Sequence, residues 1–497
     1  MKRFIFFCVS ILIGLHALNA QTDLYATTTS DSLPVYDFPR LDTLRILKKD
    51  PWLAGAQVIG VNIGVWAFDR YILKGDYAYI NLQTMKHNIR SGFYWDNDNF
   101  QTNSFSHPYH GSIYMNAGRS NGLNFWQSGL YAVGGSFMWE MFMERELPST
   151  NDFIATPIGG AALGEVLFRA SDWVIDDRTT GWERFGHEFA CLVLSPARGL
   201  TRIINGDAWR RSSNRGRSIA PQPMSLYLGM GFKALELKNN ILDRGVGLAV
   251  DLGFIYGDLY DSEDTKPYDY FTLRGSFNLQ KKQPFLGQIN LIGRLWGKEL
   301  YEKNNNELHF GLFQHFDYYA SDTISDISNK KPYEIATPAA FGVGLIFRGK
   351  TLNDTWGYSA HLHLNGIILG ASISDYYFLD ERGYNWGSGY GAKIGGSVSY
   401  KNKLSLTLAN EHYHIFTWNG YDPNMDLSTV NFRTLNVQGD KSDVLFNIST
   451  LGLGYRFNQK WSIGASGTLF VRRTDYAYRE DYLSITQENR LMAIIKF

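Results

Sequence analysis

The sequence has 497 residues, and its 48 lysines and arginines are balanced by 48 aspartates and glutamates, so the formal net charge is zero. A balanced charge argues against a nucleic-acid-binding protein, because phosphate recognition needs a clustered positive surface. Aromatic residues make up 15% of the chain and there are 49 glycines, yet the mean hydropathy is only -0.24. This combination is typical of membrane β-barrels.

The N-terminus predicts a secretion signal over residues 1–20. Two basic residues precede an apolar run that is too short to span a bilayer, and the run ends at Ala20, a suitable site for signal-peptidase cleavage. Cys8 lies in this leader, so Cys191 is the only cysteine expected in the mature chain, and no intrachain disulfide can form.

Residues 51–68 contain no charged side chain and are long enough to suggest a transmembrane helix. However, a strongly apolar helix would tend to stop a secreted chain in the inner membrane. Small and amide residues also interrupt the run, namely Gly55, Gln57, Gly60, Asn62 and Gly64. Because such residues lower the hydrophobicity and allow close helix contacts, we expect a buried periplasmic or lumen-plugging helix rather than a membrane span.

The stretch SFSHPYHGSIYMNAGRSNGLNFWQ, residues 104–127, contains the first candidate site. His107 and His110 are three residues apart and would share one face of a helix, although Pro108 disfavours a helix at His107 itself. One of the two histidines could act as a general base in a hydrolase of envelope lipids.

Acidic partners for such a base occur before and after this stretch. Glu140 lies in a glycine-rich helical pattern at 129–143, and Asp152 follows a predicted helix cap at Ser149 or Thr150. Upstream, the sequence WDNDN offers Asp96 and Asp98 as weak candidates for oxygen ligands of a metal. Neither the catalytic nor the metal interpretation has a diagnostic spacing.

A structural interpretation explains the same residues without chemistry. Buried charges persist only when they are paired, so ion pairs could fix the register of glycine-packed helices. The residues concerned are His107, Arg119, Glu140, Asp152 and Glu165. We weigh this interpretation above catalysis. No cofactor motif is found, because His187 lacks the second histidine of a zinc-protease signature and GGAALGE lacks the lysine of a phosphate loop.

From about residue 222 onward, the apolar side chains recur at every second position in segments of roughly ten residues. In LYLGMGFK, for example, Leu228 and Phe232 share one face, and Lys233 lies on the other. The second faces are rich in glycine and small polar residues, as expected of a barrel lumen. The pattern predicts an antiparallel transmembrane β-barrel of about twelve strands.

The connections between these segments give the expected orientation. Working back from Phe497, the long connections after residues 318, 372 and 418 are predicted to be extracellular, and the turns near 402 and 459 periplasmic. Two early connections do not fit this orientation, since the short one at 280–284 would lie outside and the long one at 256–269 inside. The strand count therefore carries a margin of about two.

Charged and histidine side chains on the second face are expected to point into the lumen. They are Arg274, Arg294, His309, His315, His361, His363, Lys393 and Glu411. They could select a solute or form an enzyme site in the barrel wall, but a salt-bridged plug that closes a small barrel is the commoner arrangement.

Three blocks of the sequence, DNDNFQTNSFSHPYHGSIYMNAGRSNGLNFWQS, WEMFMERELPSTNDFIATPIGGAALGE and PARGLTRIINGDAWR, resemble an uncharacterised bacterial envelope family, domain of unknown function 3943. The resemblance covers about residues 85–211 and implies an outer-membrane or envelope location without an established activity. A shorter stretch is similar to VanZ-like helical proteins. The residues that fit are Glu140, Ser149, Asp152, Gly160 and Gly164.

The sequence thus predicts an N-terminal α-helical domain followed by a C-terminal β-barrel in the outer membrane of a Gram-negative cell. The expected order is a signal peptide, a polar segment, the helical domain, a linker and the barrel, at residues 1–20, 21–50, 51–209, 210–223 and 224–497. The expected partners are outer-membrane lipid and the barrel-assembly machinery, which would bind the C-terminal strand ending at Phe497. The leading function is envelope maintenance or transport, and the alternative is hydrolysis of lipid A or phospholipid.

Overall fold

The structure is a computed structural model in which the chain forms two units. It describes residues 43–96, 98–237, 240–260, 266–280, 283–321, 331–351, 353–379, 382–426, 428–431 and 435–497. One unit is helical and contains the described residues up to Pro221 together with Asn424–Val437, and the other contains Gln222–Pro423 and Gln438–Phe497. The predicted signal peptide and most of the polar segment lie outside the described residues.

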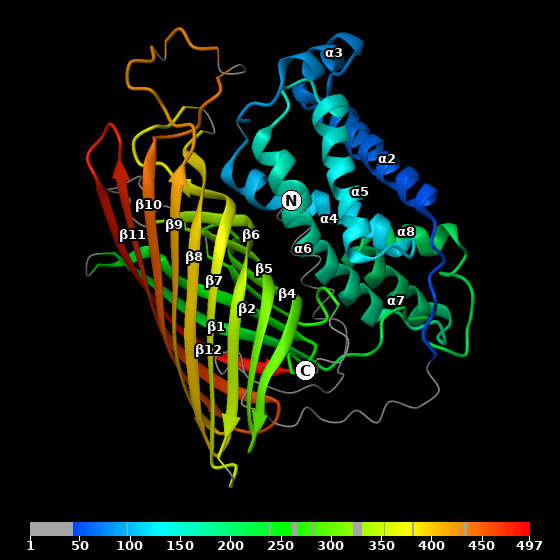
Figure 1. Ribbon diagram of the computed structural model, residues 1–497, viewed down its shortest axis with the longest axis vertical. Helices are drawn as coiled ribbons and strands as arrows, with labels where there is room; N and C mark the ends of the chain where they lie inside the picture. The colour runs from blue at the N-terminus through cyan, green and yellow to red at the C-terminus, as the bar shows by residue number, and fades with distance from the viewer. Residues whose placement is uncertain are drawn as a thin grey trace. The chain divides into compact units, whose positions relative to one another are not determined.

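The described part of the helical unit contains seven α-helices (Figure 1). They are α2 (Pro51–Phe68), α3 (Leu82–Ser91), α4 (His107–Ser120), α5 (Phe125–Met138), α6 (Thr150–Val174), α7 (Gly181–Leu194) and α8 (Pro196–Ile204). Short π-helical turns follow α2 and α5, at Asp69–Leu73 and Trp139–Met143, and another precedes α4 at Thr102–Ser106. Helices α7 and α8 are separate although only Ser195 lies between them, because Pro196 cannot continue the hydrogen bonding of α7.

Helices α4 and α6 are held together through glycines that let their backbones touch. A Cβ atom at Gly111 would lie 1.9 Å from the carbonyl oxygen of Thr156, and one at Gly160 would lie 2.5 Å from the carbonyl carbon of Gly111. Any larger residue at these positions would force the helices apart. Glycine packing is therefore found for this helix pair. The close contacts expected at Gly60 and Gly64 of α2 are not formed, because nothing lies within 4 Å of a Cβ at either position.

Helix α2 is not buried as expected, and its exposed face is the apolar one. In the most apolar stretch of 18 residues, 17% is buried for α2 and 67% for α6. Both helices are long and apolar enough to cross a membrane. Trp52 is 90% exposed. The face that contacts other helices is polar: the Gln57 amide donates to Thr201 Oγ1 at 2.8 Å, and the Asn62 amide donates to the Gly135 carbonyl at 3.2 Å.

The second unit is a closed antiparallel barrel of twelve strands in sequence order, in which β1 also pairs with β12 (Figure 1). The strands are β1 (Met224–Leu237), β2 (Asn240–Tyr256), β3 (Phe271–Asn278), β4 (Leu286–Lys303), β5 (Asn306–Ala320), β6 (Glu334–Lys350), β7 (Trp356–Ile373), β8 (Tyr384–Tyr400), β9 (Leu404–Thr417), β10 (Ser442–Arg456), β11 (Trp461–Tyr476) and β12 (Tyr482–Lys496). The predicted fold class and strand number are confirmed.

The alternating pattern separates an outer and an inner row of side chains. On β1, for example, Met230 and Phe232 are 52% and 63% exposed, whereas Lys233 is buried. The two early connections also lie as the strand count requires. At the two ends of the connection between β2 and β3, the Leu259 carbonyl and Asp269 bind Arg294 of the inner row. The barrel has the twelve strands counted from the sequence, so no early strand was miscounted.

A substitution at the α4–α6 contact tests this account of the helical unit. We expect Gly160→Val to lower the free energy of unfolding of the helical unit by about 3 kcal/mol, because the new side chain would overlap the backbone at Gly111. Thermal unfolding of the full chain in detergent, followed by the helical circular dichroism signal, measures this. Gly134→Ala is the matched control, since nothing lies within 4 Å of that position. Equal effects of the two variants would contradict the contact.

Candidate functional site: a buried histidine–carboxylate cluster

Most of the candidate catalytic residues meet where the segment before α4 approaches the start of α6. His107 is the first residue of α4, and Asp152 lies in the first turn of α6. Contrary to the expectation from Pro108, the helix includes His107. Proline is tolerated in the first turn of a helix, and here a π-helical turn leads directly into α4.

The imidazole of His107 lies between two carboxylates. Its Nε2 atom is 3.3 Å from Asp98 Oδ2 and 3.7 Å from Asp152 Oδ2. Asp96 completes the group, because its Oδ1 accepts hydrogen bonds from the amides of Asn103 and Asn151 at 2.6 and 3.0 Å. The weak metal candidates Asp96 and Asp98 are therefore brought to His107, and one ligand atom from each of the three lies within 4.8 Å of the others.

Glu140 borders this cluster and is fixed by the cap of α6. Its Oε2 accepts the backbone N–H of Ser149 at 2.6 Å, while Ser149 Oγ accepts the N–H of Asp152 at 3.2 Å. The cap predicted at Ser149 or Thr150 is thus Ser149. The amide of Asn88 on α3 also donates to the Glu140 carbonyl, at 3.4 Å.

Burial dominates the electrostatics of the cluster. Burial raises the pKa of Glu140 to about 7, although the hydrogen bond from Ser149 acts to lower it. Burial together with the charge of Asp96 raises the pKa of Asp152 well above its usual range. Burial opposes the charge on His107, but Asp152 and the hydrogen bond to Asp98 outweigh it and raise the pKa of His107 to about 10. His107 is therefore a cation at neutral pH, held by carboxyl groups.

His110 has a different environment one turn further along α4. Burial, assisted by the charge on His107, lowers the pKa of His110 to about 3, so its ring is neutral. Its Nε2 lies 3.0 Å from the hydroxyl of Tyr114, which donates to Asn62 of α2, and its ring packs edge-on against Trp139 at 5.1 Å. His110 therefore joins α4 to the π-helical turn after α5 and, through Tyr114, to α2.

The remaining residues of the expected network lie at the other end of α4. Arg119 Nε donates to Glu165 Oε2 at 2.7 Å, and Arg169 Nε donates to Glu165 Oε1 at 3.0 Å. Glu165 is fully buried. Sequence reasoning missed the asparagines that donate hydrogen bonds around the histidine–carboxylate cluster, namely Asn88, Asn103 and Asn151. No periodic pattern distinguishes these amides from surface residues.

The arrangement suits ion pairing better than base catalysis. A protonated His107 cannot accept a proton, and His110 is committed to Tyr114. Among the described residues, neither histidine has a hydrogen bond to a serine or a cysteine. Cys191 is buried in α7, where burial raises the pKa of its thiol to about 11.

In the barrel, the predicted lumen-facing residues lie on the inner row, and three of them are joined by ion pairs or hydrogen bonds. Lys393 Nζ donates to both carboxylate oxygens of Asp317, at 2.6 and 2.7 Å, and lies 3.9 Å from Glu411 Oε2. Glu411 also accepts the hydroxyl of Tyr319 at 2.9 Å. Arg294 pairs with Asp269 at 2.9 Å.

The histidines of the inner row pack against one another and against glycines. The rings of His315 and His363 are 5.2 Å apart, and those of His361 and His363 are 5.9 Å apart. His309 is fully buried 6.2 Å from the ring of Tyr260. Arg274 differs, because it is exposed on the same row as the buried Ser276.

Sequence reasoning missed an aromatic cluster that crosses the lumen. Its members are Tyr319, Tyr333, Ile335, Ala340, Ile367, Tyr413, Ile415, Phe446, Ile448 and Phe470. The rings of Tyr333 and Phe470 stack at 4.4 Å, and Tyr319 lies 6.5 Å from Phe470. Beside them, Arg472 makes two hydrogen bonds of 2.6 and 2.7 Å with the carboxylate of Asp375.

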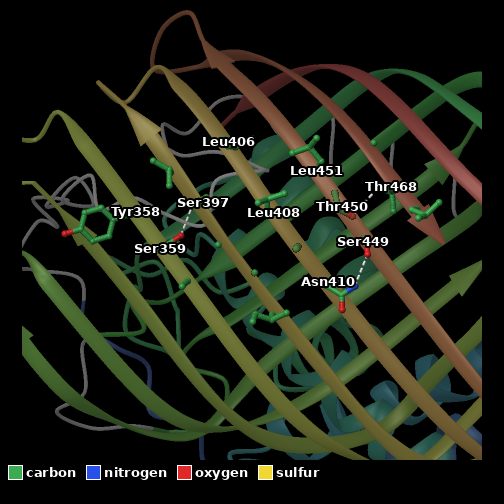
Figure 2. Close-up of a pocket in the computed structure, with 18 of the residues that line it drawn as sticks. Tyr358, Ser359, Ser397, Leu406, Leu408, Asn410, Ser449, Thr450, Leu451 and Thr468 are labelled. Carbon is green, nitrogen blue, oxygen red and sulfur yellow. Dashed lines mark hydrogen bonds between the residues drawn. The ribbon is translucent and has the colours of Figure 1, made fainter. Parts of the chain in front are cut away.

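The outer wall has a groove of 880 Å³ that crosses from β6 to β12. Its lining includes four leucines, Leu406, Leu408, Leu451 and Leu469, and small residues such as Gly396 and Gly467 leave its floor open. Figure 2 shows Asn410 of β9 and Ser449 of β10 joined by a hydrogen bond in this groove, beside Leu408 and Leu451.

The pKa shifts predict how the stability of the helical unit depends on pH. Folded Glu140 keeps its proton up to about pH 7 whereas an unfolded glutamate loses it near 4.5, so stability should fall between these values. Protonation of His107 stabilises the fold below 6.5, and this contribution is lost as the pH rises towards about 10. Thermal unfolding between pH 4.5 and 10 measures both effects.

Glu140→Gln separates the two contributions. It should make the fall in melting temperature below pH 7 less steep, because only the raised pKa values of Asp96, Glu144 and Asp152 then contribute, and it should leave the loss above pH 7 that comes from His107 in place. A melting temperature that rises with pH over the whole range would show that the carboxyl groups of the cluster are ionised in the folded protein.

Residues 92–197, which contain the whole histidine–carboxylate cluster, match the model of a family described as a domain of unknown function, DUF3943. The match confirms the resemblance for this region and assigns no activity, and the VanZ-like resemblance stays a prediction. No curated protein matches the chain.

The barrel has distant likenesses among solved structures. The NanC porin is 6% identical, with 54% of this chain and 98% of that chain covered at a TM-score of 0.27. The toluene transporter TbuX of Ralstonia pickettii is 11% identical, with 56% and 89% covered at 0.22. An outer membrane channel from Pseudomonas putida F1 is 10% identical, with 55% and 94% covered at 0.26. At such low scores these likenesses carry no conclusion about a solute.

Proposed function

We propose that this protein is a closed outer-membrane barrel that anchors its helical unit in the cell envelope, and that it is not an open pore. The observation that carries the proposal is the contact between side chains from opposite sides of the ring. Tyr319 of β5 and Phe470 of β11 belong to strands six positions apart in the closed order of twelve, yet their rings are 6.5 Å apart.

Polar contacts reinforce this closure at other points of the lumen. Lys393 on β8 reaches Asp317 on β5, three strands away, and Arg472 of β11 reaches both Asp375, just after β7, and the Pro332 carbonyl before β6. Buried charges that bind partners on distant strands resist separation, because an unpaired charge there would be strongly destabilising. The contacts of the inner row therefore favour a lumen filled by side chains over an open path for a solute.

Lipid hydrolysis has less support. A hydrolase of this type needs a neutral histidine within reach of a nucleophile. Among the described residues of the cluster, the histidine between the carboxylates is charged and the neutral one is bound to Tyr114. The cluster is instead suited to fixing α4 against α6, the role that sequence reasoning weighed highest.

The helical unit is proposed to lie against the membrane through α2 and α5. Ile63 on α2 and Leu130 on α5 are 47% and 71% exposed, whereas the polar Asn62, which directly precedes Ile63, is fully buried. A helix that buries amides and exposes aliphatic side chains is suited to an apolar medium. Residues 205–223 join this unit to β1, so the unit is tethered at the bilayer.

Planar-bilayer recording tests the closed lumen. We expect no steady conductance from the wild-type chain, and discrete open steps from Tyr333→Ala combined with Phe470→Ala, because this pair removes the stacked rings from the lumen. Leu469→Ala, on the outer row, should remain closed. Stable open steps from the wild-type protein would overturn the proposal.

A fluorescent label tests the position of the helical unit. Because Cys191 is buried, Ile63→Cys introduces one reactive thiol on the exposed face of α2. In lipid nanodiscs we expect blue-shifted emission that is quenched by brominated acyl chains. Gln83→Cys, on the exposed polar start of α3, should behave as in water. Water-like emission at both positions would exclude membrane contact by α2.

A further inference from the structure

The outer row of the barrel carries a patch of polar side chains among its aliphatic residues. We call it the amide patch; it comprises Asn410, His412, Asn447, Ser449, Gln487 and Asn489. Three hydrogen bonds link its members in pairs: Asn410 to Ser449 at 2.9 Å, His412 to Asn447 at 2.9 Å and Gln487 to Asn489 at 3.1 Å. The patch borders the groove of Figure 2, whose lining includes Asn410, Ser449 and Gln487.

The patch lies near the middle of the membrane-facing wall. Asn410 is six residues from Leu404, the first residue of β9, and six from Phe416 near the end of that strand. Six residues of a strand span about 20 Å, which with the tilt of a barrel places Asn410 well inside the hydrocarbon band. Exposed aromatic residues mark the two borders, with Tyr455 and Trp461 at one end and Phe416 and Trp418 at the other.

The pairs within the chain do not use all the hydrogen-bonding capacity of these side chains. In two of these pairs, Asn410 and Gln487 use only their amide nitrogens as donors, and among the described residues Asn410 Oδ1 and Gln487 Oε1 accept no hydrogen bond. Asn410 is partly exposed and Gln487 is exposed. Acyl chains offer neither donors nor acceptors, so lipid leaves these groups unsatisfied in a medium that contains no water.

We propose that the amide patch and its groove form the interface with a second copy of this chain. A carboxamide carries both donors and an acceptor, so a surface of asparagine and glutamine side chains is complementary to itself when related by a two-fold axis. The small floor residues Gly396 and Gly467 let the walls approach, and the leucines beside them fill the groove of the partner. An acyl chain would fill the groove but would not bind the amides.

The oligomeric state of the full chain in detergent and in nanodiscs tests this proposal. We expect light scattering after size exclusion to give the mass of two copies. Asn410→Leu combined with Gln487→Leu should give the mass of one copy, because these changes remove the amides and leave an apolar wall. Leu312→Ala, an outer-row change on β5, should leave two copies. Heat-modifiable migration on gels verifies that each variant retains the folded barrel.

Cysteine crosslinking locates the contact independently. Ser449→Cys places a thiol within the patch, and mild oxidation should link two copies, whereas Leu312→Cys should remain unlinked. A single-copy mass for the wild type in both media would overturn the proposal. So would a two-copy mass that survives Asn410→Leu with Gln487→Leu, or linkage at position 312 alone. Retained lipid on a single-copy wild type would assign the groove to an acyl chain instead.

Discussion

The structure depends on one constraint, that a sheet in hydrocarbon must satisfy its backbone hydrogen bonds without help from its surroundings. The pairing of β1 with β12 closes the ring, so that no strand edge remains open. In the closed barrel, alternate side chains of each strand face either the lumen or the lipid. A charge on the inner row needs a partner inside the barrel, and a polar group on the outer row becomes an exception that requires its own explanation.

The inner row meets this demand by joining distant strands. Lys393 and Asp317 are both almost fully buried, as are Arg472 and Asp375. Each pair bridges parts of the barrel that are not neighbours. The ion pairs therefore stabilise the barrel and at the same time place side chains across the lumen. The aromatic rings around Phe470 add dry packing to these ion pairs. The contacts that stabilise the barrel are therefore the same contacts on which the proposed closure of the lumen rests.

Sequence reasoning recovered what depends on local periodicity. Alternation identified the strands and the inner row, and the apolar run at 51–68 matched α2 residue for residue. It could not identify partners that are remote in the chain, such as Asp375 for Arg472. These two residues are 97 positions apart and meet only after the barrel closes. It also misjudged which face of α2 is buried. Gln57 and Asn62 were counted as weakening an apolar helix, whereas they are the residues that attach α2 to its neighbours.

The outward-facing side chains of α2 and those of the barrel wall at β9 and β12 differ in how well they suit hydrocarbon. On α2, amides turn inward and aliphatic side chains turn outward, so the bare surface suits hydrocarbon. On β9 and β12, amides turn outward from a wall that is otherwise apolar, so the bare surface does not suit hydrocarbon. The first surface can be covered by lipid alone. The second needs a partner with hydrogen-bonding groups, and for a self-complementary set of amides an identical surface is the simplest such partner.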